Sequence, residues 1–244
     1  MAAGFHDDEA PLFSQFWLNS ELNPTRAALL RQRIDHDKVA GGPTPPLRWR
    51  EAAHALPPAD AAVQADWAPR RSVRRFAPRP LAAQALSDLL WPLAQRADGH
   101  RGLASGGGKY PVDLHVIGLA IDGQVPGTAC YDPRRHGLVP TGPAPAWPDC
   151  QAVLGFECED PPAAVLVLTA RPQATLAKYG ERGARFALLE AGSHLGALQA
   201  GTARAGLGGV AIGAFQDRAL LALIGADPRQ TLALLAYAVG HADD

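Results

Sequence analysis

Apolar and polar positions along this chain repeat with periods that change from block to block, and each block predicts one kind of element. The stretch NPTRAALLRQRIDH (23–36) spaces its apolar residues as on one helix face, with Asn23 as the expected N-cap and a proline at the first helical position. A run rich in glycine and proline over 40–49 predicts a linker. An amphipathic pattern over 82–94 predicts a second helix.

Beyond residue 100 the pattern predicts a sheet with helices around it. YPVDLHVIGLAI (110–121) alternates and is rich in valine and isoleucine, which is typical of a strand. PAAVLVLTAR (162–171) is almost wholly apolar, so we expect a strand that is buried on both faces. The remaining pattern predicts a hairpin and an irregular flap over 122–150, helices over 185–206 and 217–224, and a C-terminal strand within 231–244.

These elements together predict an α+β fold, in which long helices pack on a small mixed or antiparallel sheet. The chain has 244 residues, of which 47% are hydrophobic, and this is enough for one substantial core. A change of pattern near residue 66 indicates an N-terminal helical extension over 1–65 and a main domain over 66–244.

The long helix predicted over 185–206 carries small residues along one face, which permits close packing against another helix. His194 lies among these small residues, so we expect it to be buried and hydrogen-bonded rather than catalytic. Glu190, one turn earlier on the same face, is its expected partner.

Composition and charge exclude several classes of function. The net charge of -1 gives no overall field that would attract nucleic acid or an anionic membrane. No apolar run reaches the roughly 18–20 residues that a membrane span needs. Three cysteines without CxxC spacing, and an N-terminus without a signal-peptide pattern, lead us to expect a cytoplasmic protein without a disulfide framework or a metal site.

The basic run RRSVRRF offers the first candidate chemistry. Arg70, Arg71 and Arg74 carry fork-shaped donors, and Ser72 adds a hydroxyl between them. Such a set suits a phosphate group, which guanidinium binds through two parallel hydrogen bonds. Charge alone favours the alternative, a solvated basic turn.

Two glycine-rich stretches offer bare backbone. LASGGGKY places Ser105, Gly106 and Gly107 directly before a predicted strand, where a chain without side chains can approach a flat ligand closely. Gly208 and Gly209 follow the long helix and could turn their N–H groups toward a ring. Neither stretch has the spacing of a P-loop or of GxGxxG, and each could be an ordinary turn or helix C-cap.

Lys178, one of only three lysines, stands beside Tyr179 ahead of a glycine and a helical run. A lysine whose pKa is lowered by burial or by a neighbouring cation can act as a base, whereas arginine cannot. The alternative is a solvated charge at a helix entrance near Glu181, which the residues alone favour.

The order and spacing of these stretches resemble a known family. RRSVRRF, then SGGGKYPVDLHV, then KYGERGARFALLEAGSHLGALQAGTARAGLGGVAIGAF are similar to the FMN-dependent nitroreductase superfamily over about 68–241. Within it the chain most resembles the SagB/ThcOx-type azoline oxidases, which read P-S-A-G-G-x-Y-P-V-E and K-Y-G-E-R-x-x-R-F/Y at the last two motifs. The resemblance implies a nitroreductase-like sandwich and a domain-swapped homodimer with two FMN sites at its interface.

The resemblance also implies a role for each matching residue. Lys178 and Tyr179 would act in proton transfer. His241 stands where an arginine that binds the phosphate is usual, and Gly106 stands where an alanine is usual. The residues that would hold FMN are Arg70, Arg71, Ser72 and Arg74 at the phosphate and ribityl chain, Ser105, Gly106 and Gly107 along the ring, Gly208 and Gly209 near its reactive edge, and His241.

The implied activity is an FMN-dependent oxidation of azoline rings to azoles, on a peptide or carrier-bound intermediate, with a cyclodehydratase or synthetase as partner. A second hypothesis is an NAD(P)H-dependent nitro- or quinone reductase, which needs no base such as Lys178. A third is a catalytically degenerate flavin-binding subunit of a biosynthetic complex. Its support is that His241 and Gly106 depart from the residues usual in the family.

Overall fold

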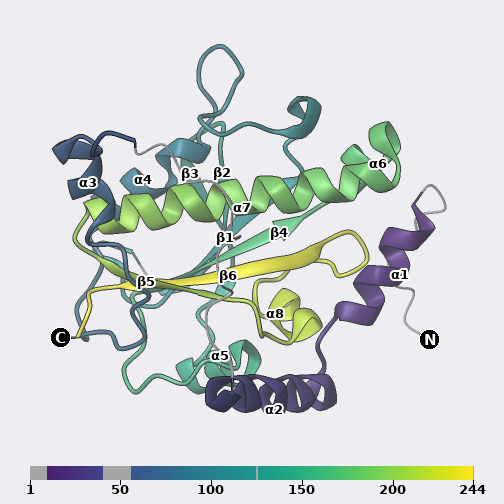
Figure 1. Ribbon diagram of the computed structural model, residues 1–244, viewed down its shortest axis with the longest axis horizontal. Coiled ribbons are helices and arrows are strands. Elements are labelled where there is room, and N and C mark those ends of the chain that lie inside the picture. Colours follow the sequence, from purple (N-terminus) through teal and green to yellow (C-terminus); the bar gives the residue numbers. More distant parts are fainter. Residues whose placement is uncertain (1–9, 41–55, 125, 244) are drawn as a thin grey trace.

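The structure, a computed structural model, describes residues 10–40, 56–124 and 126–243. Its middle layer is a six-stranded sheet in the order β3-β2-β1-β4-β6-β5, in which every neighbouring pair is antiparallel (Figure 1). The strands are β1 (Val112–Gly118), β2 (Gly127–Asp132), β3 (Gly137–Pro143), β4 (Ala164–Ala170), β5 (Gly208–Ile212) and β6 (Leu232–Gly240).

Helices cover both faces of the sheet, which confirms the predicted α+β fold. The longest, α7 (Glu181–Arg204), crosses one face, where α4 also packs, and α5 and α8 cover the opposite face (Figure 1). The other helices are α1 (Pro11–Ser20), α2 (Pro24–Ala40), α3 (Ala61–Trp67), α4 (Ala83–Leu90), α5 (Trp147–Leu154), α6 (Gln173–Tyr179) and α8 (Asp217–Leu223), with short 3-10 turns at Trp91–Leu93 and Gly106–Gly108.

The central strand β4 explains why the sheet lies between two layers of helices. All of its residues are buried, as the uninterrupted apolar run predicted. Val165 and Val167 contact the cluster that includes α5 and α8. Leu166 and Leu168 point the other way, into the cluster that includes α4 and α7. Alternation along one strand therefore supplies both cores.

Helix boundaries follow the capping signals of the sequence. The Asn23 side chain accepts a hydrogen bond from the amide of Arg26 at 2.9 Å, so the predicted N-cap of α2 is confirmed. Gly180 has a φ of 53°, which separates α6 from α7 and starts the long helix earlier than predicted. At its other end Gly206 has a φ of 64°, and the amide of Leu207 returns to the carbonyl of Thr202 at 3.0 Å, as in a Schellman cap.

Two regions differ from the predictions. The hairpin of β2 and β3 is confirmed, but the flap predicted to be irregular up to residue 150 ends in helix α5, which Pro148 helps to begin. The stretch after α7 forms strand β5 although Gly208 and Gly209 open it, because pairing with β6 supplies the hydrogen bonds. The predicted linker at 40–49 lies, beyond residue 40, outside the described residues.

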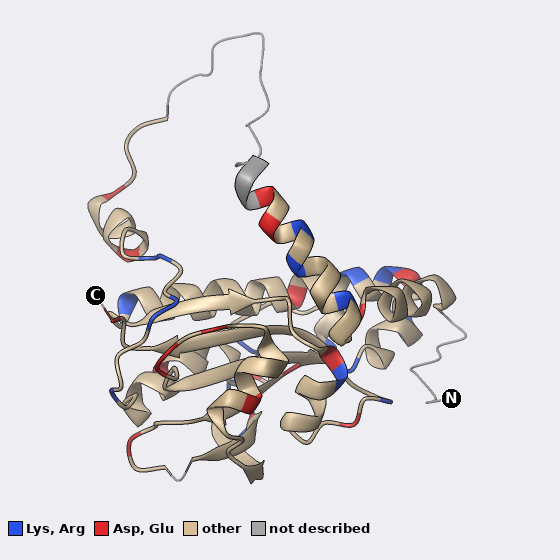
Figure 2. Ribbon diagram, turned by 90° about the horizontal axis from the view of Figure 1, so that it is seen from below, with Lys and Arg blue, Asp and Glu red and all other residues tan. Residues whose placement is uncertain are grey.

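The N-terminal region is attached to the main body through α1. Phe13 and Trp17 are buried and pack with Leu176 of α6. The carboxylate of Glu181 accepts hydrogen bonds from the amides of Leu12 and Phe13, both at 2.8 Å, and so caps α1 from the start of α7. Helix α2 extends away from the sheet and carries charged residues along its length (Figure 2). In the described part of the chain, no helix is long and apolar enough to cross a membrane.

Candidate functional site

The basic run is held in place by its two apolar residues. Val73 and Phe76 are buried in the core on the α5 and α8 side. The side chains between and before them are therefore left at the surface, and Arg70, Arg71 and Arg74 are exposed. The segment lies this way because its two apolar side chains are buried in the core while the charged guanidinium groups stay in contact with water.

Backbone pairing joins this run to β5. Ser72 forms a parallel bridge with Gly209, and the amide of Val73 donates to the carbonyl of Gly209 at 3.0 Å. A Cβ on Gly208 would lie 2.7 Å from the side chain of Val73, and one on Gly209 would overlap the hydroxyl of Tyr237. Both glycines are thus required by close packing, and they bring the basic run against the start of β5.

Arg70 and Arg71 line a small hollow together with Thr202 and Tyr237. Burial raises the pKa of Tyr237, while a hydrogen bond with Thr202 and the charge of Arg70 act in the opposite direction. The Thr202 hydroxyl donates to the carbonyl of Leu198 at 2.7 Å, so the guanidinium groups of Arg70 and Arg71 are the donors here that suit an anion such as a phosphate. We call this region, formed by Arg70, Arg71, Ser72, Gly208 and Gly209 at the C-terminal end of α7, the arginine end.

Arg74 and His241 flank the arginine end. The carbonyl of His241 accepts a hydrogen bond from the amide of Ala77 at 3.0 Å, which brings the C-terminal segment beside the basic run. His241 is half-buried, and its Nε2 lies 3.2 Å from the carbonyl oxygen of Pro80, to which it donates. In this chain the ring is therefore occupied by a backbone contact beside the hollow.

The triple glycine forms a tight loop at the opposite end of α7. Gly107 and Gly108 have φ values of 64° and 67°, in the left-handed region that favours glycine. A Cβ on Gly106 would lie 2.9 Å from the side chain of Phe186. A Cβ on Gly107 would lie 2.8 Å from Nζ of Lys178 and would overlap the hydroxyl of Tyr179. The bare backbone of this loop thus contacts the Lys-Tyr pair that the sequence singled out.

A buried carboxylate supports this loop from α7. The hydroxyl of Ser105 accepts a hydrogen bond from the amide of Tyr110 at 2.7 Å and donates to Glu190. Oε1 of Glu190 also accepts from the amide of Val112 at 3.4 Å. Burial raises the pKa of Glu190, and its other oxygen, Oε2, has no partner among the described residues. Glu190 therefore links Ser105, directly before the glycines, to Val112, the first residue of β1.

Lys178 and Tyr179 occupy the last turn of α6. The ring of Tyr179 packs edge-on against Phe186 with centroids 5.0 Å apart, and Nζ of Lys178 lies 5.0 Å from the centroid of the Tyr179 ring. Lys178 is exposed in the single chain. The carboxylate of Glu181 turns to the amides of α1. We call Ser105–Gly108, Lys178 and Tyr179 the glycine-loop end.

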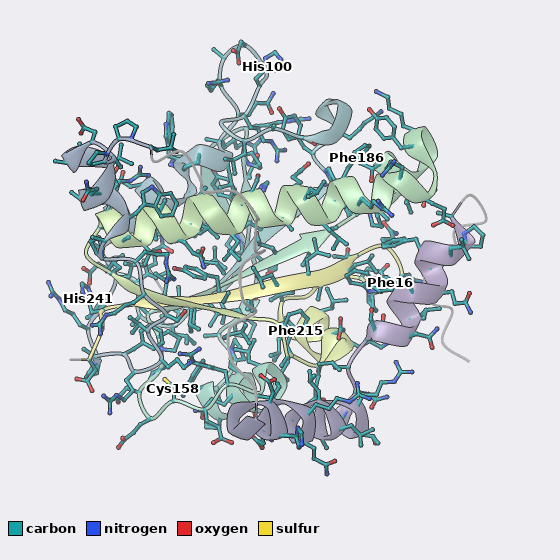
Figure 3. The ribbon with its side chains drawn as sticks, viewed as in Figure 1. Phe16, His100, Cys158, Phe186, Phe215 and His241 are labelled. Carbon is teal, nitrogen blue, oxygen red and sulfur yellow. The ribbon has the colours of Figure 1, made fainter. Side chains whose placement is uncertain are left out.

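The two ends lie far apart within one chain. Phe186 beside the glycine loop and Thr202 beside the arginines are separated by about 24 Å along α7, at about 1.5 Å per residue. Figure 3 shows Phe186 and His241 toward opposite ends of the molecule. The structure therefore brings together the predicted residues in two groups, and a single chain does not join the groups into one site.

Sequence reasoning missed Tyr237 and gave Glu190 and Glu181 other roles than the structure shows. Tyr237 lies behind Gly209, Glu190 supports the glycine loop, and Glu181 caps α1. A signal existed for Glu190, since it falls on the buried face of a helix between Ala187 and Ala191. His194 is buried and bonded as expected, but Nδ1 contacts the backbone carbonyl of Glu190 at 2.8 Å rather than its carboxylate. Within the described ranges, no group of histidine, cysteine, aspartate or glutamate is arranged to hold a metal ion.

Comparison with known proteins agrees with this architecture. Residues 68–241 match the model of the Nitroreductase family. The chain is a member of the nitroreductase family. As a member of this family, the protein is a flavoprotein oxidoreductase. The nitroreductase-like protein MJ1384 of Methanocaldococcus jannaschii is 30% identical over 151 residues, which are 61% of this chain and 76% of that protein.

Solved structures share the fold of this nitroreductase-family protein. A chain of the E. coli microcin synthetase McbBCD complex, with truncated pro-MccB17 bound, superposes with a TM-score of 0.69 at 18% identity, over 93% of this chain and 96% of that one. A nitroreductase-like protein of Desulfovibrio desulfuricans in complex with FMN gives a TM-score of 0.51 at 17% identity, over 77% of this chain and 89% of that one.

Proposed function

We propose that this nitroreductase-family protein is an FMN-dependent oxidase that converts azoline rings to azoles on a peptide or a carrier-bound intermediate. The observation that carries the proposal is the contact of Lys178 and Tyr179 with the backbone of the glycine loop. A general reductase has no need of a base at this place. The likeness to a microcin synthetase solved with a peptide bound supports a peptide substrate and a synthetase partner.

The residues present fit FMN in two parts. The arginine end offers guanidinium and hydroxyl donors for the phosphate, from Arg70, Arg71 and Ser72, with Arg74 and His241 at its margin. The glycine-loop end offers a flat, bare backbone at Gly106 and Gly107 for the ring. We propose that a second copy of the chain joins these parts, so that the arginine end of one copy meets the glycine-loop end of the other.

The outward face of α7 suits such a pairing. Leu189 is 70% exposed and Leu188 is 43% exposed, although both are large apolar residues on a long helix. A Cβ added at Gly192 or Gly196 would meet nothing within 4 Å, so a second helix could approach closely there. A homodimer with a two-fold axis would form the joined site twice, because an isologous interface repeats every contact.

In the proposed reaction, Lys178 removes the proton from the ring carbon that bears the peptide chain. Bound FMN would supply the acceptor for the hydride from the neighbouring ring carbon, so that the azoline loses a proton and a hydride and becomes aromatic. Lys178 needs a neutral amine for this step, and it is exposed in the single chain. Covering by the second copy and by the substrate would exclude water from this amine. Tyr179 would share or orient the proton. Dioxygen is the proposed final electron acceptor.

The test is anaerobic mixing of the purified flavin-loaded protein with a thiazoline-bearing peptide, followed through the visible absorbance of the flavin. We expect the peptide to bleach this band, and Lys178→Ala to slow bleaching by about 100-fold or more, as for loss of a general base. Lys178→Arg is the matched control, because it keeps the charge and length but cannot donate a lone pair. Recovery of bleaching in Lys178→Arg would show that only the charge matters.

NADPH in place of the peptide separates the second hypothesis from the first. Rapid bleaching by NADPH, unchanged in Lys178→Ala, would identify a nitro- or quinone reductase. A protein that retains no FMN on purification, and takes up none from solution, would instead be the degenerate subunit that the His241 and Gly106 departures suggest.

A further inference from the structure

A second cavity lies on the face of the sheet that α4 and α7 cover, beside the outer strands β2 and β3. It has a volume of about 710 Å³ and opens between α4 and the hairpin of β2 and β3. This volume falls within the range of small-molecule pockets, about 300–1,000 Å³. Its walls are largely apolar and include Leu86, Leu90, Val116, Ile121, Leu138 and Pro140.

One wall carries a chain of three polar side chains. Nε2 of His136 lies 2.8 Å from the hydroxyl of Ser87, and Nδ1 lies 2.7 Å from the hydroxyl of Tyr131. The three residues line the cavity. His136 has a φ of 48°, a left-handed conformation that is uncommon outside glycine, and its ring packs edge-on against Trp91 at 5.1 Å. Packing and two hydrogen bonds thus fix the ring at the cavity wall.

The direction of these hydrogen bonds follows from proton counting. Burial raises the pKa of Tyr131 to about 12, so its hydroxyl keeps its proton. That proton has two acceptors within reach, the carbonyl of Leu90 at 3.3 Å and Nδ1 of His136 at 2.7 Å. The shorter contact to Nδ1 is the stronger one. With Nδ1 as the acceptor, the ring carries its proton on Nε2 and donates it to Ser87.

Ser87 is left with a hydroxyl proton that the chain of three does not use. A hydroxyl that already accepts from Nε2 can still donate once. We propose that this cavity binds a neutral, mainly apolar small molecule whose single hydrogen-bond acceptor, such as a carbonyl oxygen, receives the proton of Ser87. The site is separate from the arginine end and the glycine-loop end, and it does not depend on the function proposed above.

The shape of the rim favours a small molecule over an added peptide strand. β3 is the edge strand of the sheet and forms one side of the cavity. Pro140 and Pro143 lie in β3 and lack an amide proton. Proline on an edge strand hinders the pairing of a further strand.

The test uses two probes of almost the same shape. Benzophenone carries a carbonyl between two phenyl rings, and diphenylmethane replaces that carbonyl by a methylene. Isothermal titration calorimetry of the full-length purified protein should show saturable one-to-one binding of both, with benzophenone the tighter. Ser87→Ala should weaken benzophenone by about 3–10-fold, as for the loss of one hydrogen bond, and leave diphenylmethane unchanged.

Filling the cavity gives an independent readout. Ala129→Phe, or Gly137→Leu if the first variant melts early, should abolish binding of both probes, since both residues line the cavity. Ala152→Phe, on the exposed side of α5, is the matched control and should bind like the unmodified protein. The proposal is overturned if neither probe saturates, if binding survives both filling variants, or if Ser87→Ala weakens both probes equally.

Discussion

The two ends of α7 hold their functional residues by different means. The arginine end is secured by backbone: Ser72 bridges to Gly209, and two glycines admit Val73 and Tyr237 into close contact. The glycine-loop end is secured by one buried side chain, Glu190, which contacts Ser105 in the loop and the amide of Val112 at the start of β1. The first end should therefore fail when volume is added, and the second when a polar group is removed.

A side chain added at Gly209 is expected to cause the largest loss of stability. Gly209→Ala would place a Cβ against Tyr237, which is buried and paired in β6 and cannot move aside. Overpacking of this kind costs about 3 kcal/mol, which lowers the melting temperature by roughly 6–12 °C in a chain of this size. Scanning calorimetry measures the change.

Two further variants sharpen that result. Gly213→Ala lies just beyond β5, where an added Cβ meets nothing within 4 Å, so its melting temperature should stay close to that of the unmodified protein. Tyr237→Phe removes the overlapping hydroxyl and should partly rescue Gly209→Ala. An equal loss of stability in Gly209→Ala and Gly213→Ala would contradict the packing argument.

Removal of the Glu190 carboxylate is expected to cause the second-largest loss of stability. Glu190→Ala leaves the amide of Val112 and the hydroxyl of Ser105 without their partner, which should cost about 2 kcal/mol in the free energy of unfolding. Amide hydrogen exchange should rise over 105–112 and stay unchanged at β5. Gly209→Ala should show the reverse, so the two variants together test the comparison directly.

Glu190→Gln tests which property of that side chain matters. The amide keeps the shape and one acceptor oxygen, and its NH₂ replaces Oε2, which has no partner among the described residues. We expect a cost below about 1 kcal/mol and normal exchange over 105–112. If Glu190→Gln instead behaved like Glu190→Ala, the negative charge itself would be required.

An expected effect of similarly small size concerns a buried carboxylate away from both ends. Asp217 accepts a hydrogen bond from the amide of Leu22 at 2.8 Å, and burial raises its pKa to about 6. Because the folded pKa exceeds the unfolded one, protonation of Asp217 stabilises the fold; this contribution is complete below about pH 4 and is lost as the pH rises through 6. Between pH 7.5 and pH 5 the gain should be on the order of 1 kcal/mol, since solvent partly screens the group.

Asp217→Asn removes this titration and keeps an acceptor for Leu22. Its melting temperature should change less between pH 7.5 and pH 5 than that of the unmodified protein. An unchanged pH dependence in Asp217→Asn would assign the effect to another group, such as Glu190, whose pKa burial also raises.

Strong periodic patterns made much of the fold predictable. β4 and α7 were foreseen because an unbroken apolar run and a long helical period leave few other structures. β5 was not, because glycine has a low strand propensity and the pairing partner, β6, lies far along the chain. Helix α5 was missed because the prolines before it read as an irregular flap.

The candidate site shows the same limit. Its residue types could be read from the motifs, but the motifs do not say which of them meet in space. Glu190 looked like a helical partner of His194, and its carboxylate instead reaches Val112, 78 positions earlier. The predicted residues divide between two ends because α7 is one continuous helix of 24 residues, which the motifs alone do not reveal.

That continuous helix has a genetic consequence. If each active centre takes one end from each of two chains, a chain damaged only at the arginine end and a chain damaged only at the glycine-loop end are both inactive by themselves. Assembled with each other, they would concentrate both defects in one centre and leave the other intact. Two dead alleles would then complement, with at most about half of the sites restored in each mixed dimer.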